Sequence, residues 1–263
     1  MAEAVFAELG FEVRRDAFRE DMTPQIVATL RGTEEPDEIV VVGAHYDSRG
    51  TMSTSPTQRA PGADDNGSGS ASVLEFARVI HETGATFRKT LKLCLFTGEE
   101  QGLIGSRALA SQYADEGENI IAMFNADMIG YAPEGDDIIL AYMNRNADPD
   151  LTELSRDITE LYVPEVQTDL TNVCCSDQQS FFENGFSSVG FFETPNPTVV
   201  YPQYHTSDDL LQFLSAEKIY LLTKATLASA IVFAEPIEFK HKGLHGNHTN
   251  LLATAANITT TTN

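Results

Sequence analysis

The sequence predicts an α/β fold whose central, mostly parallel sheet is covered by helices on both faces. Short, wholly apolar runs such as residues 39–43 are typical of parallel strands that are buried on both sides. Longer segments with apolar residues at helical spacing separate these runs, and strands that alternate with helices favour a parallel sheet. The 263 residues suffice for one large domain with a substantial buried core.

The strands are expected in a definite order along the chain. An opening helix ends within the first ten residues and leads into an antiparallel pair at residues 11–19 and 25–31. The buried strands are expected at residues 39–43, 91–97, 121–126 and 188–192.

Helices fill the gaps between these strands. Residues 70–82 place their apolar side chains on one stripe, which indicates an amphipathic helix. We expect Ser176 and Gln179 to form a capping box, and Ser215 to cap the last helix. The other expected helices cover residues 103–113, a segment after Pro149, residues 176–185 and residues 216–233.

One domain is expected over residues 1–239, followed by a polar, low-complexity tail at residues 240–263. The tail contains glycosylation sequons at Asn247 and Asn257. The first residues contain no signal peptide, and their helical pattern is consistent with a start inside a longer precursor. We expect an extracellular or vacuolar-type location. The tail also contains three histidines, His241, His245 and His248, which we interpret as part of a disordered segment rather than as a metal site.

The charge of the chain limits its partners. Asp and Glu total 39 against 17 Lys and Arg, which gives a net charge of −22. Such a charge repels nucleic acid and anionic membranes. No apolar run reaches the roughly 18–20 residues that a membrane-spanning helix needs. We therefore expect neither nucleic acid nor a membrane as a partner, and we expect a monomer.

The three cysteines predict no disulfide framework. Cys94 lies in an apolar strand pattern, where a packed thiol is expected. Cys174 and Cys175 are adjacent, and a bridge between neighbouring cysteines is strained and rare.

Five residues of metal-ligand type are expected each at the end of an apolar, strand-like run. They are His45, Asp65, Glu100, Asp127 and His205. Two imidazoles and three carboxylates form the mixed nitrogen and oxygen set that suits zinc. In open α/β sheets the ligand crevice lies at the carboxyl ends of the strands, so three separate strand ends should deliver these residues to one edge.

The neighbours of these ligands have distinct expected roles. Asp47 follows His45 by two residues and would lie on the same face of an extended segment, where its carboxylate can accept a hydrogen bond from the imidazole. An alternative interpretation is a surface aspartate. Asp65 lies in the glycine-rich loop GADDNGSGSA, and its two oxygens can bridge two metal ions. Such a pair of aspartates is usually only a turn, but the other four ligands favour the metal interpretation.

Glu99 is the expected general base and acid. In extended backbone Glu99 and Glu100 point to opposite sides, so Glu99 can face the substrate water when Glu100 faces a metal. Tyr204, next to His205, could donate a hydrogen bond to an oxyanion, or could simply pack in the pocket.

The motifs GAHYDS, PGADDNGSGSA, FTGEEQGLIGS, NADMIG and YHTSDD together resemble the M28 family of zinc aminopeptidases over about residues 11–234. The resemblance implies an eight-stranded mixed sheet and two zinc ions. It assigns His45 and Asp127 to one ion, Glu100 and His205 to the other, and Asp65 to both. It also implies a cis peptide bond after Asp65. The expected activity is removal of N-terminal residues from peptides with a free N-terminus.

One segment departs from the family pattern. Relatives often carry CSDH with an upstream cysteine, whereas this chain has Gln178 for the histidine and Thr171 near the position of that cysteine. The usual disulfide is therefore not expected. An apolar pocket for a bulky first residue would draw on Met128, Val173, Phe181, Phe182, Phe192 and Tyr201.

Three alternatives have the same fold. A glutaminyl cyclase has much of the same ligand set but binds one zinc. It carries tryptophans at its pocket, whereas this chain has no tryptophan. A non-enzymatic binding module should have lost ligands, and here all five are present. A carboxypeptidase or dipeptidase of the wider clan usually carries an inserted domain, for which the sequence shows no segment.

Overall fold

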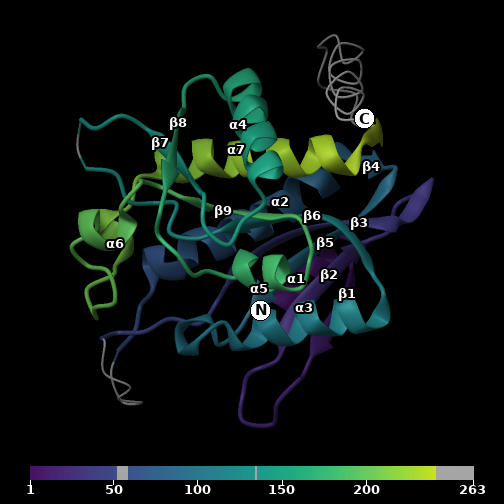
Figure 1. Cartoon of the computed structure of the whole chain (residues 1–263), viewed down its shortest axis with the longest axis horizontal. Coiled ribbons are helices and arrows are strands. Elements are labelled where there is room, and N and C mark those ends of the chain that lie inside the picture. The colour runs from purple at the N-terminus through teal and green to yellow at the C-terminus, as the bar shows by residue number, and fades with distance from the viewer. Residues whose placement is uncertain (52–58, 134, 241–263) are drawn as a thin grey trace.

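The computed structural model describes residues 1–51, 59–133 and 135–240, and it confirms the α/β fold. An eight-stranded mixed sheet forms its centre, with the order β1-β2-β5-β3-β6-β9-β7-β8 (Figure 1). The strands are β1 (Glu12–Asp16), β2 (Gln25–Leu30), β3 (Glu35–His45), β5 (Lys89–Phe96), β6 (Asn119–Ala126), β7 (Ile139–Met143), β8 (Gln167–Thr171) and β9 (Ser188–Phe192).

The four middle strands of the sheet are parallel. β3 pairs in parallel with β5 and β6, and β6 pairs in parallel with β9. The β1–β2, β2–β5 and β7–β9 pairs are antiparallel, and β7 with β8 is again parallel. A separate antiparallel pair joins β4 (Thr86–Phe87) to β10 (Pro236–Glu238). The carboxyl ends of β5, β3, β6 and β9 therefore lie at one edge of the sheet.

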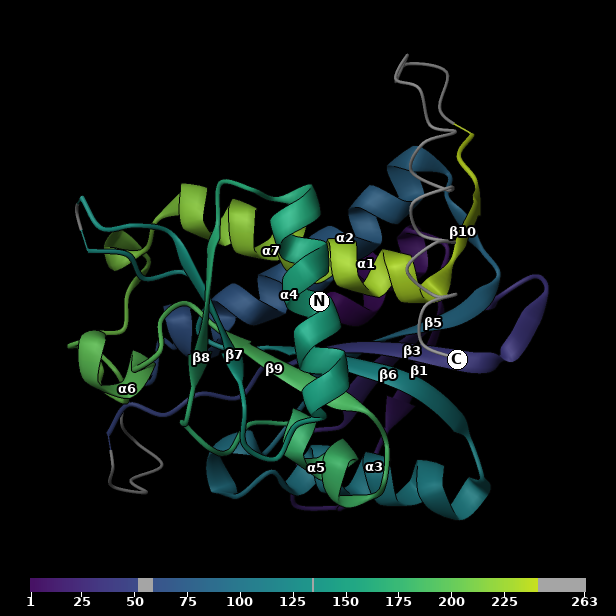
Figure 2. The same cartoon turned by 45° about the horizontal axis from the view of Figure 1, so that its top comes forward.

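Helices cover both faces of this sheet. Figure 2 shows α1, α2 and α7 on one face, and α3 and α5 on the other. The helices are α1 (Ala2–Glu8), α2 (Gly69–Thr83), α3 (Ile104–Glu116), α4 (Pro149–Tyr162), α5 (Gln178–Glu183), α6 (Pro197–Val200) and α7 (Ala216–Ala234). Shorter helical turns are η1 (Ala63–Ser68), η2 (Glu99–Gln101) and η3 (Leu211–Phe213).

The apolar run in β3 is explained by its two buried faces. Val40 and Val42 belong to the core under α2 and α7, whereas Val41 belongs to the core under α3 and α5. Because successive side chains of a strand point to opposite faces, a strand between two helical layers needs apolar residues at every position. Burial of each such side chain contributes about 1.5–3 kcal/mol.

Most of the expected elements are present. The opening helix, the antiparallel pair and the four buried strands form as predicted, and Ser215 caps α7 by accepting a hydrogen bond from the Lys218 amide at 3.2 Å. The capping box of Ser176 and Gln179 is wrong. The Ser176 hydroxyl instead accepts a hydrogen bond from the Asn125 side chain at 2.8 Å, and α5 begins only at Gln178.

Strands β7 and β8 were not predicted. β8 has the sequence QTDLT and is largely exposed, so it has no continuous apolar run. Its place is decided by pairing with β7, which is itself held against β9.

The tail from residue 241 onward lies outside the described residues, together with His241, His245, His248 and the sequons at Asn247 and Asn257. Within the described ranges, none of the helices has the length and apolar character required to traverse a bilayer.

Candidate metal centre

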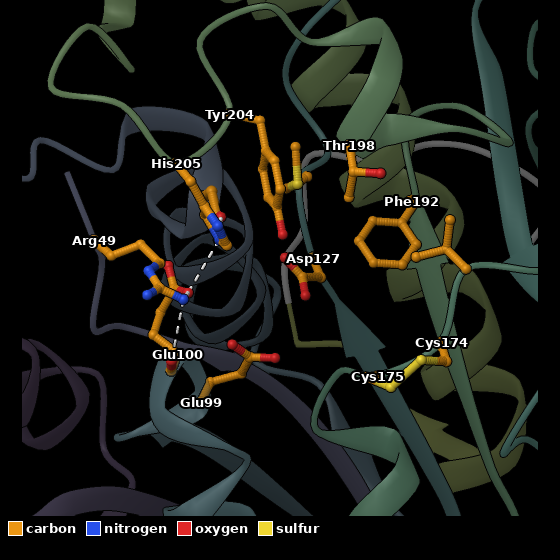
Figure 3. A pocket seen from close by; sticks show the side chains of 13 residues that line it. Arg49, Glu99, Glu100, Asp127, Cys174, Cys175, Phe192, Thr198, Tyr204 and His205 are labelled. Carbon is orange, nitrogen blue, oxygen red and sulfur yellow. Dashed lines mark hydrogen bonds and ion pairs between the residues drawn. A yellow bond between two sulfur atoms is a disulfide. The ribbon is translucent and has the colours of Figure 1, made fainter. Parts of the chain in front are cut away.

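The predicted metal ligands gather at the carboxyl edge of the parallel strands. His45 is the last residue of β3, Asp127 directly follows β6, and Glu100 lies in η2 just after β5. Asp65 comes from η1, ahead of α2, and His205 comes from the loop between α6 and η3. Figure 3 shows Glu100, Asp127 and His205 facing a common cavity.

Asp65 lies between the two histidines. Its Oδ1 is 3.3 Å from Nε2 of His45, and its Oδ2 is 3.1 Å from Nε2 of His205. Each histidine has a second carboxylate partner. Oδ1 of Asp127 is 3.5 Å from His45 Nε2, and Oε2 of Glu100 is 3.0 Å from His205 Nε2. Each imidazole therefore contacts one carboxylate of its own, and both imidazoles contact the carboxylate of Asp65.

These side chains fit zinc by their chemistry. His45, Glu99 and Asp127 form one group of ligand-type atoms, and Asp65, Glu100 and His205 form a second, with all atoms of a group within 4.8 Å of one another. Glu100 Oε1 is buried and accepts no hydrogen bond from residues 1–51, 59–133 or 135–240. An unsatisfied buried carboxylate oxygen is costly unless a cation or donor meets it.

Neighbouring carboxylates raise the pKa of both histidines of the site. Burial tends to lower the pKa of His205, but hydrogen bonds to Asp65 and Glu100 outweigh this effect and raise its pKa to about 9. The pKa of His45 is also raised, because Asp127 and Glu99 outweigh its burial. Burial alone would raise the pKa of Asp65, yet the two histidines lower it to about 2.

Glu99 lies in the same short turn as the predicted ligand Glu100. It lies in a 3-10 turn rather than in extended backbone, so the reason given for the divergence of Glu99 and Glu100 is wrong. The two side chains still belong to different groups, Glu99 with His45 and Glu100 with His205. Burial, followed by nearby carboxylates such as Asp127, raises the pKa of Glu99 above its ordinary value. A cation bound beside Asp127 would favour the ionised form.

Asp47 supports the site in another way than expected. His45 Nδ1 donates a hydrogen bond to the backbone carbonyl of Asp47 at 3.0 Å, while the nearest carboxylate oxygen is 3.8 Å away. The Asp47 carboxylate instead accepts hydrogen bonds from the backbone amides of Glu99 at 3.2 Å and Glu100 at 3.3 Å. Its position therefore fixes both the imidazole and the turn that carries the two glutamates.

The Asp65 loop is tied to its neighbours through side-chain amides and a tight backbone. The Asp65–Asn66 peptide bond is cis, as the resemblance implied. The Asn66 side chain donates to the Ala126 carbonyl at 2.9 Å, next to Asp127. Gly62 has a φ of 58°, and a Cβ there would meet both Ser48 and the Asp65 carbonyl. Only glycine tolerates this combination at low cost.

Asp209 was not predicted as a site residue. Its buried carboxylate accepts hydrogen bonds from the backbone amides of Asp64 at 2.9 Å and Asp65 at 3.0 Å, and from the Tyr201 hydroxyl at 2.7 Å. It thus connects the loop of His205 to the loop of Asp65. A signal was present in the sequence, since Asp209 is the last acid of the YHTSDD motif.

The cavity beside the ligands has a volume of about 190 Å³. Of the predicted pocket residues, Met128, Val173 and Phe192 line it, and Tyr204 does as well. Phe181 does not, because it packs in the core under α3 beside Phe96. Phe182 and Tyr201 are also absent from its wall, since Phe182 is 40% exposed on α5 and the buried Tyr201 directs its hydroxyl to Asp209.

Four residues of this cavity were not predicted to line it: Arg49, Thr198, Cys174 and Cys175. A disulfide joins Cys174 to Cys175, a pairing of neighbours that the sequence did not predict. Cys94 is a buried free thiol, as expected. Tyr204 stacks on His205 with ring centroids 3.7 Å apart, and its hydroxyl end points toward Asp127 (Figure 3).

Known proteins are similar to this chain in sequence or in fold. The profile of peptidase family M28 matches residues 25–230. A probable leucine aminopeptidase from Arthroderma benhamiae is 35% identical over 207 residues, which cover 75% of this chain and 54% of the relative. The chain thus spans about half the length of the curated relatives it matches.

Two solved structures have folds similar to that of this chain. A zinc aminopeptidase from Bacillus subtilis has a TM-score of 0.66 at 29% identity, covering 80% of this chain and 49% of that one. A glutaminyl cyclase from Fimbriiglobus ruber has a TM-score of 0.70 at 18% identity, covering 87% and 84%, and this likeness concerns the fold alone. The sequence match and the arrangement of the ligands agree, and the chain belongs to peptidase family M28.

Proposed function

We propose that this protein is a two-zinc aminopeptidase that removes N-terminal residues from peptides. The observation that carries the proposal is the Asp65 carboxylate, which directs one oxygen to His45 and the other to His205. A single carboxylate between two imidazoles is suited to bridge two cations. The family and the leucine aminopeptidase relatives support peptide bond hydrolysis.

The residues of the site divide between two ions. His45 and Asp127 would hold the first, Glu100 and His205 the second, and Asp65 would contact both. When bound, such a pair of ions activates water and polarises the scissile carbonyl.

Glu99 is the residue we propose for proton transfer. It belongs to the group formed with His45 and Asp127 and lines the cavity, and since Asp65 already lies beside both histidines, the Glu99 carboxylate is available to a substrate in the cavity. Its carboxylate would accept a proton from the attacking water and deliver it to the leaving amine. Tyr204 would donate a hydrogen bond to the oxyanion that forms on the former carbonyl.

The size of the cavity fits a single substrate residue. Its volume of about 190 Å³ lies below the roughly 300–1,000 Å³ of pockets for drug-sized ligands. Such a cavity suits one terminal residue. Met128, Val173 and Phe192 give it an apolar wall that favours a bulky, apolar first residue. We also propose a monomer in an extracellular or vacuolar-type compartment, acting on peptides with a free N-terminus.

A glutaminyl cyclotransferase with one zinc is the alternative. The full chain has no tryptophan, and Tyr204 stands beside the last histidine. The two groups of ligand-type side chains favour two ions over one.

Activity and metal content measured on one sample test the proposal. We expect hydrolysis of leucyl-p-nitroanilide, its loss on dialysis against a chelator, and its return when about two zinc ions bind per chain. A blocked substrate such as acetyl-leucyl-p-nitroanilide is the control and should not be cleaved. Cyclisation of a glutaminyl peptide with one ion per chain, and no release of nitroaniline, would favour the alternative.

A further inference from the structure

The Cys174–Cys175 disulfide lies in the wall of the cavity that contains the metal ligands. Figure 3 shows it across the cavity from Glu100 and His205, on the same side as Phe192. Cys175 is exposed and Cys174 is half-buried, so the bridge is open to small molecules in solvent.

The segment around the bridge is anchored on both sides. On one side, the buried Thr171 hydroxyl donates to the Pro195 carbonyl at 2.6 Å and accepts from the Val173 amide at 3.0 Å. On the other side, Ser176 accepts from the Asn125 side chain at 2.8 Å. The two cysteines between these anchors make no hydrogen bond through their side chains to the described residues. Cys175 has a φ of 83°, a backbone angle that residues other than glycine rarely adopt.

The bridge completes an apolar surface. Met128, Val173 and Phe192 line the cavity beside it, whereas Glu99, Glu100, Asp65 and Asp127 line the polar part. The sulfur atoms of a disulfide are polarizable and make favourable contacts with apolar and aromatic groups. Two separate thiols would leave Cys174 and Cys175 free to rotate independently, so this surface would lose its fixed shape.

We infer that the Cys174–Cys175 disulfide forms part of the subsite for the side chain of the substrate's N-terminal residue, and that only the bridged form selects bulky apolar side chains. The inference rests on the proposed aminopeptidase function and deepens it. It makes selectivity, rather than the hydrolytic step, depend on the bond between the two sulfurs.

A trialkylphosphine can open this bridge without the zinc chelation that dithiols cause. The sulfur–sulfur bond breaks and two thiols form, each sulfur gaining one electron and one proton. The phosphine is oxidised to its phosphine oxide with the oxygen of one water molecule, whose two protons go to the thiols. Burial raises the pKa of the Cys94 thiol to about 12, so native alkylation should report on the other two cysteines.

The test compares leucyl- and alanyl-p-nitroanilide before and after reduction. We expect kcat/KM for the leucyl substrate to fall about tenfold, mainly through KM, while the alanyl value changes less than about twofold. Zinc content should stay the same. The double variant Cys174→Ala/Cys175→Ala should behave like the reduced protein and should not respond to phosphine. Cys94→Ala is the matched control and should respond like the unaltered chain.

A second readout does not need turnover. Calorimetry should show that L-leucine binds more weakly after reduction, while L-alanine binding is unchanged. An unchanged leucine-to-alanine ratio in both the reduced protein and the double variant, or alkylation of both cysteines without any reductant, would overturn the inference while leaving the aminopeptidase intact. An oxidised, zinc-loaded protein that binds leucine selectively but cleaves neither substrate would instead refute the proposed function alone.

Discussion

The carboxylate of Asp209 accepts a hydrogen bond from the backbone amide of Asp65 at 3.0 Å. Asp209 follows His205 by four residues, so this bond holds the loop of His205 against the backbone of Asp65, whose carboxylate faces both histidines. The other Asp209 oxygen accepts from Asp64 and from Tyr201. The position of His205 over the site is therefore a product of contacts between two loops rather than of a strand end.

Replacing Asp209 tests this connection. Asp209→Ala leaves two buried amides and one buried hydroxyl without an acceptor, and each such loss costs about 1–3 kcal/mol. We expect a clear loss in the free energy of unfolding and a roughly 10- to 100-fold fall in zinc affinity. Denaturant unfolding and chelator competition measure the two effects. The exposed neighbour gives the control variant Asp208→Ala, which should change neither quantity.

Substitution of Glu99 separates proton transfer from metal binding. Glu99→Gln keeps the size of the side chain but removes its ability to accept a proton. We expect kcat for leucyl-p-nitroanilide to fall about 10²- to 10⁴-fold, with KM and zinc content nearly unchanged. Glu153→Gln, at an exposed position on α4, is the control. A Glu99→Gln protein with full activity would show that another group transfers the proton.

The proposed bridging role of Asp65 predicts a change in metal stoichiometry. Asp65→Asn is neutral and offers only one oxygen, so it cannot serve both histidines as the aspartate does. Mutation of a residue that only hydrogen-bonds to a metal ligand typically lowers metal affinity about 10- to 100-fold. For Asp65→Asn we expect zinc affinity to fall by more than this, and fewer than two zinc ions to bind per chain. Titration followed by metal analysis decides this, with Asp115→Asn at an exposed position as control. Two tightly bound ions in Asp65→Asn would contradict the bridge.

Tyr204 should affect turnover more than binding. Tyr204→Phe keeps the ring that stacks on His205 and removes only the hydroxyl. If the hydroxyl stabilises the oxyanion, kcat should fall by about 10²- to 10³-fold, which is the loss typical when one such hydrogen-bond donor is removed. Zinc content and KM should remain close to those of the unaltered chain. Tyr220→Phe, at a residue 65% exposed, controls for the loss of a hydroxyl elsewhere. An unchanged kcat would leave Tyr204 with a packing role only.

Zinc affinity should rise with pH. Burial lowers the pKa of His205, but its hydrogen bonds to Asp65 and Glu100 prevail and raise the value to about 9 in the metal-free protein. Zinc binds the neutral imidazole, so below pH 9 each binding event must displace this proton. The apparent affinity should then increase about tenfold per pH unit for each displaced proton, and the His205 contribution should level off above pH 9.

Chelator competition between pH 6.5 and 9.5, with proton release measured in weak buffer, checks this prediction about the imidazoles. Zinc binding without proton release near pH 7 would show that His205 is already neutral there.

Much of the fold could be predicted from local pattern. The buried strands β3, β5, β6 and β9 each carry a continuous apolar run, because both of their faces contact helices. The exposed strand β8 has no such run, and its position depends on a partner far away in the sequence. A prediction from local pattern cannot contain that pairing.

The sequence by itself identified His45, Glu100 and Asp127 as candidate metal ligands, because each lies at or just after a run whose period and composition indicate a buried strand. Only the tertiary structure decided how these residues face one another. It placed Asp65 between two histidines, gave the His45 hydrogen bond to the carbonyl of Asp47, and moved Phe181 from the pocket into the core. The physical reason is that distances between loops depend on packing and hydrogen bonds between segments far apart in the chain, and these have no local signature in the sequence.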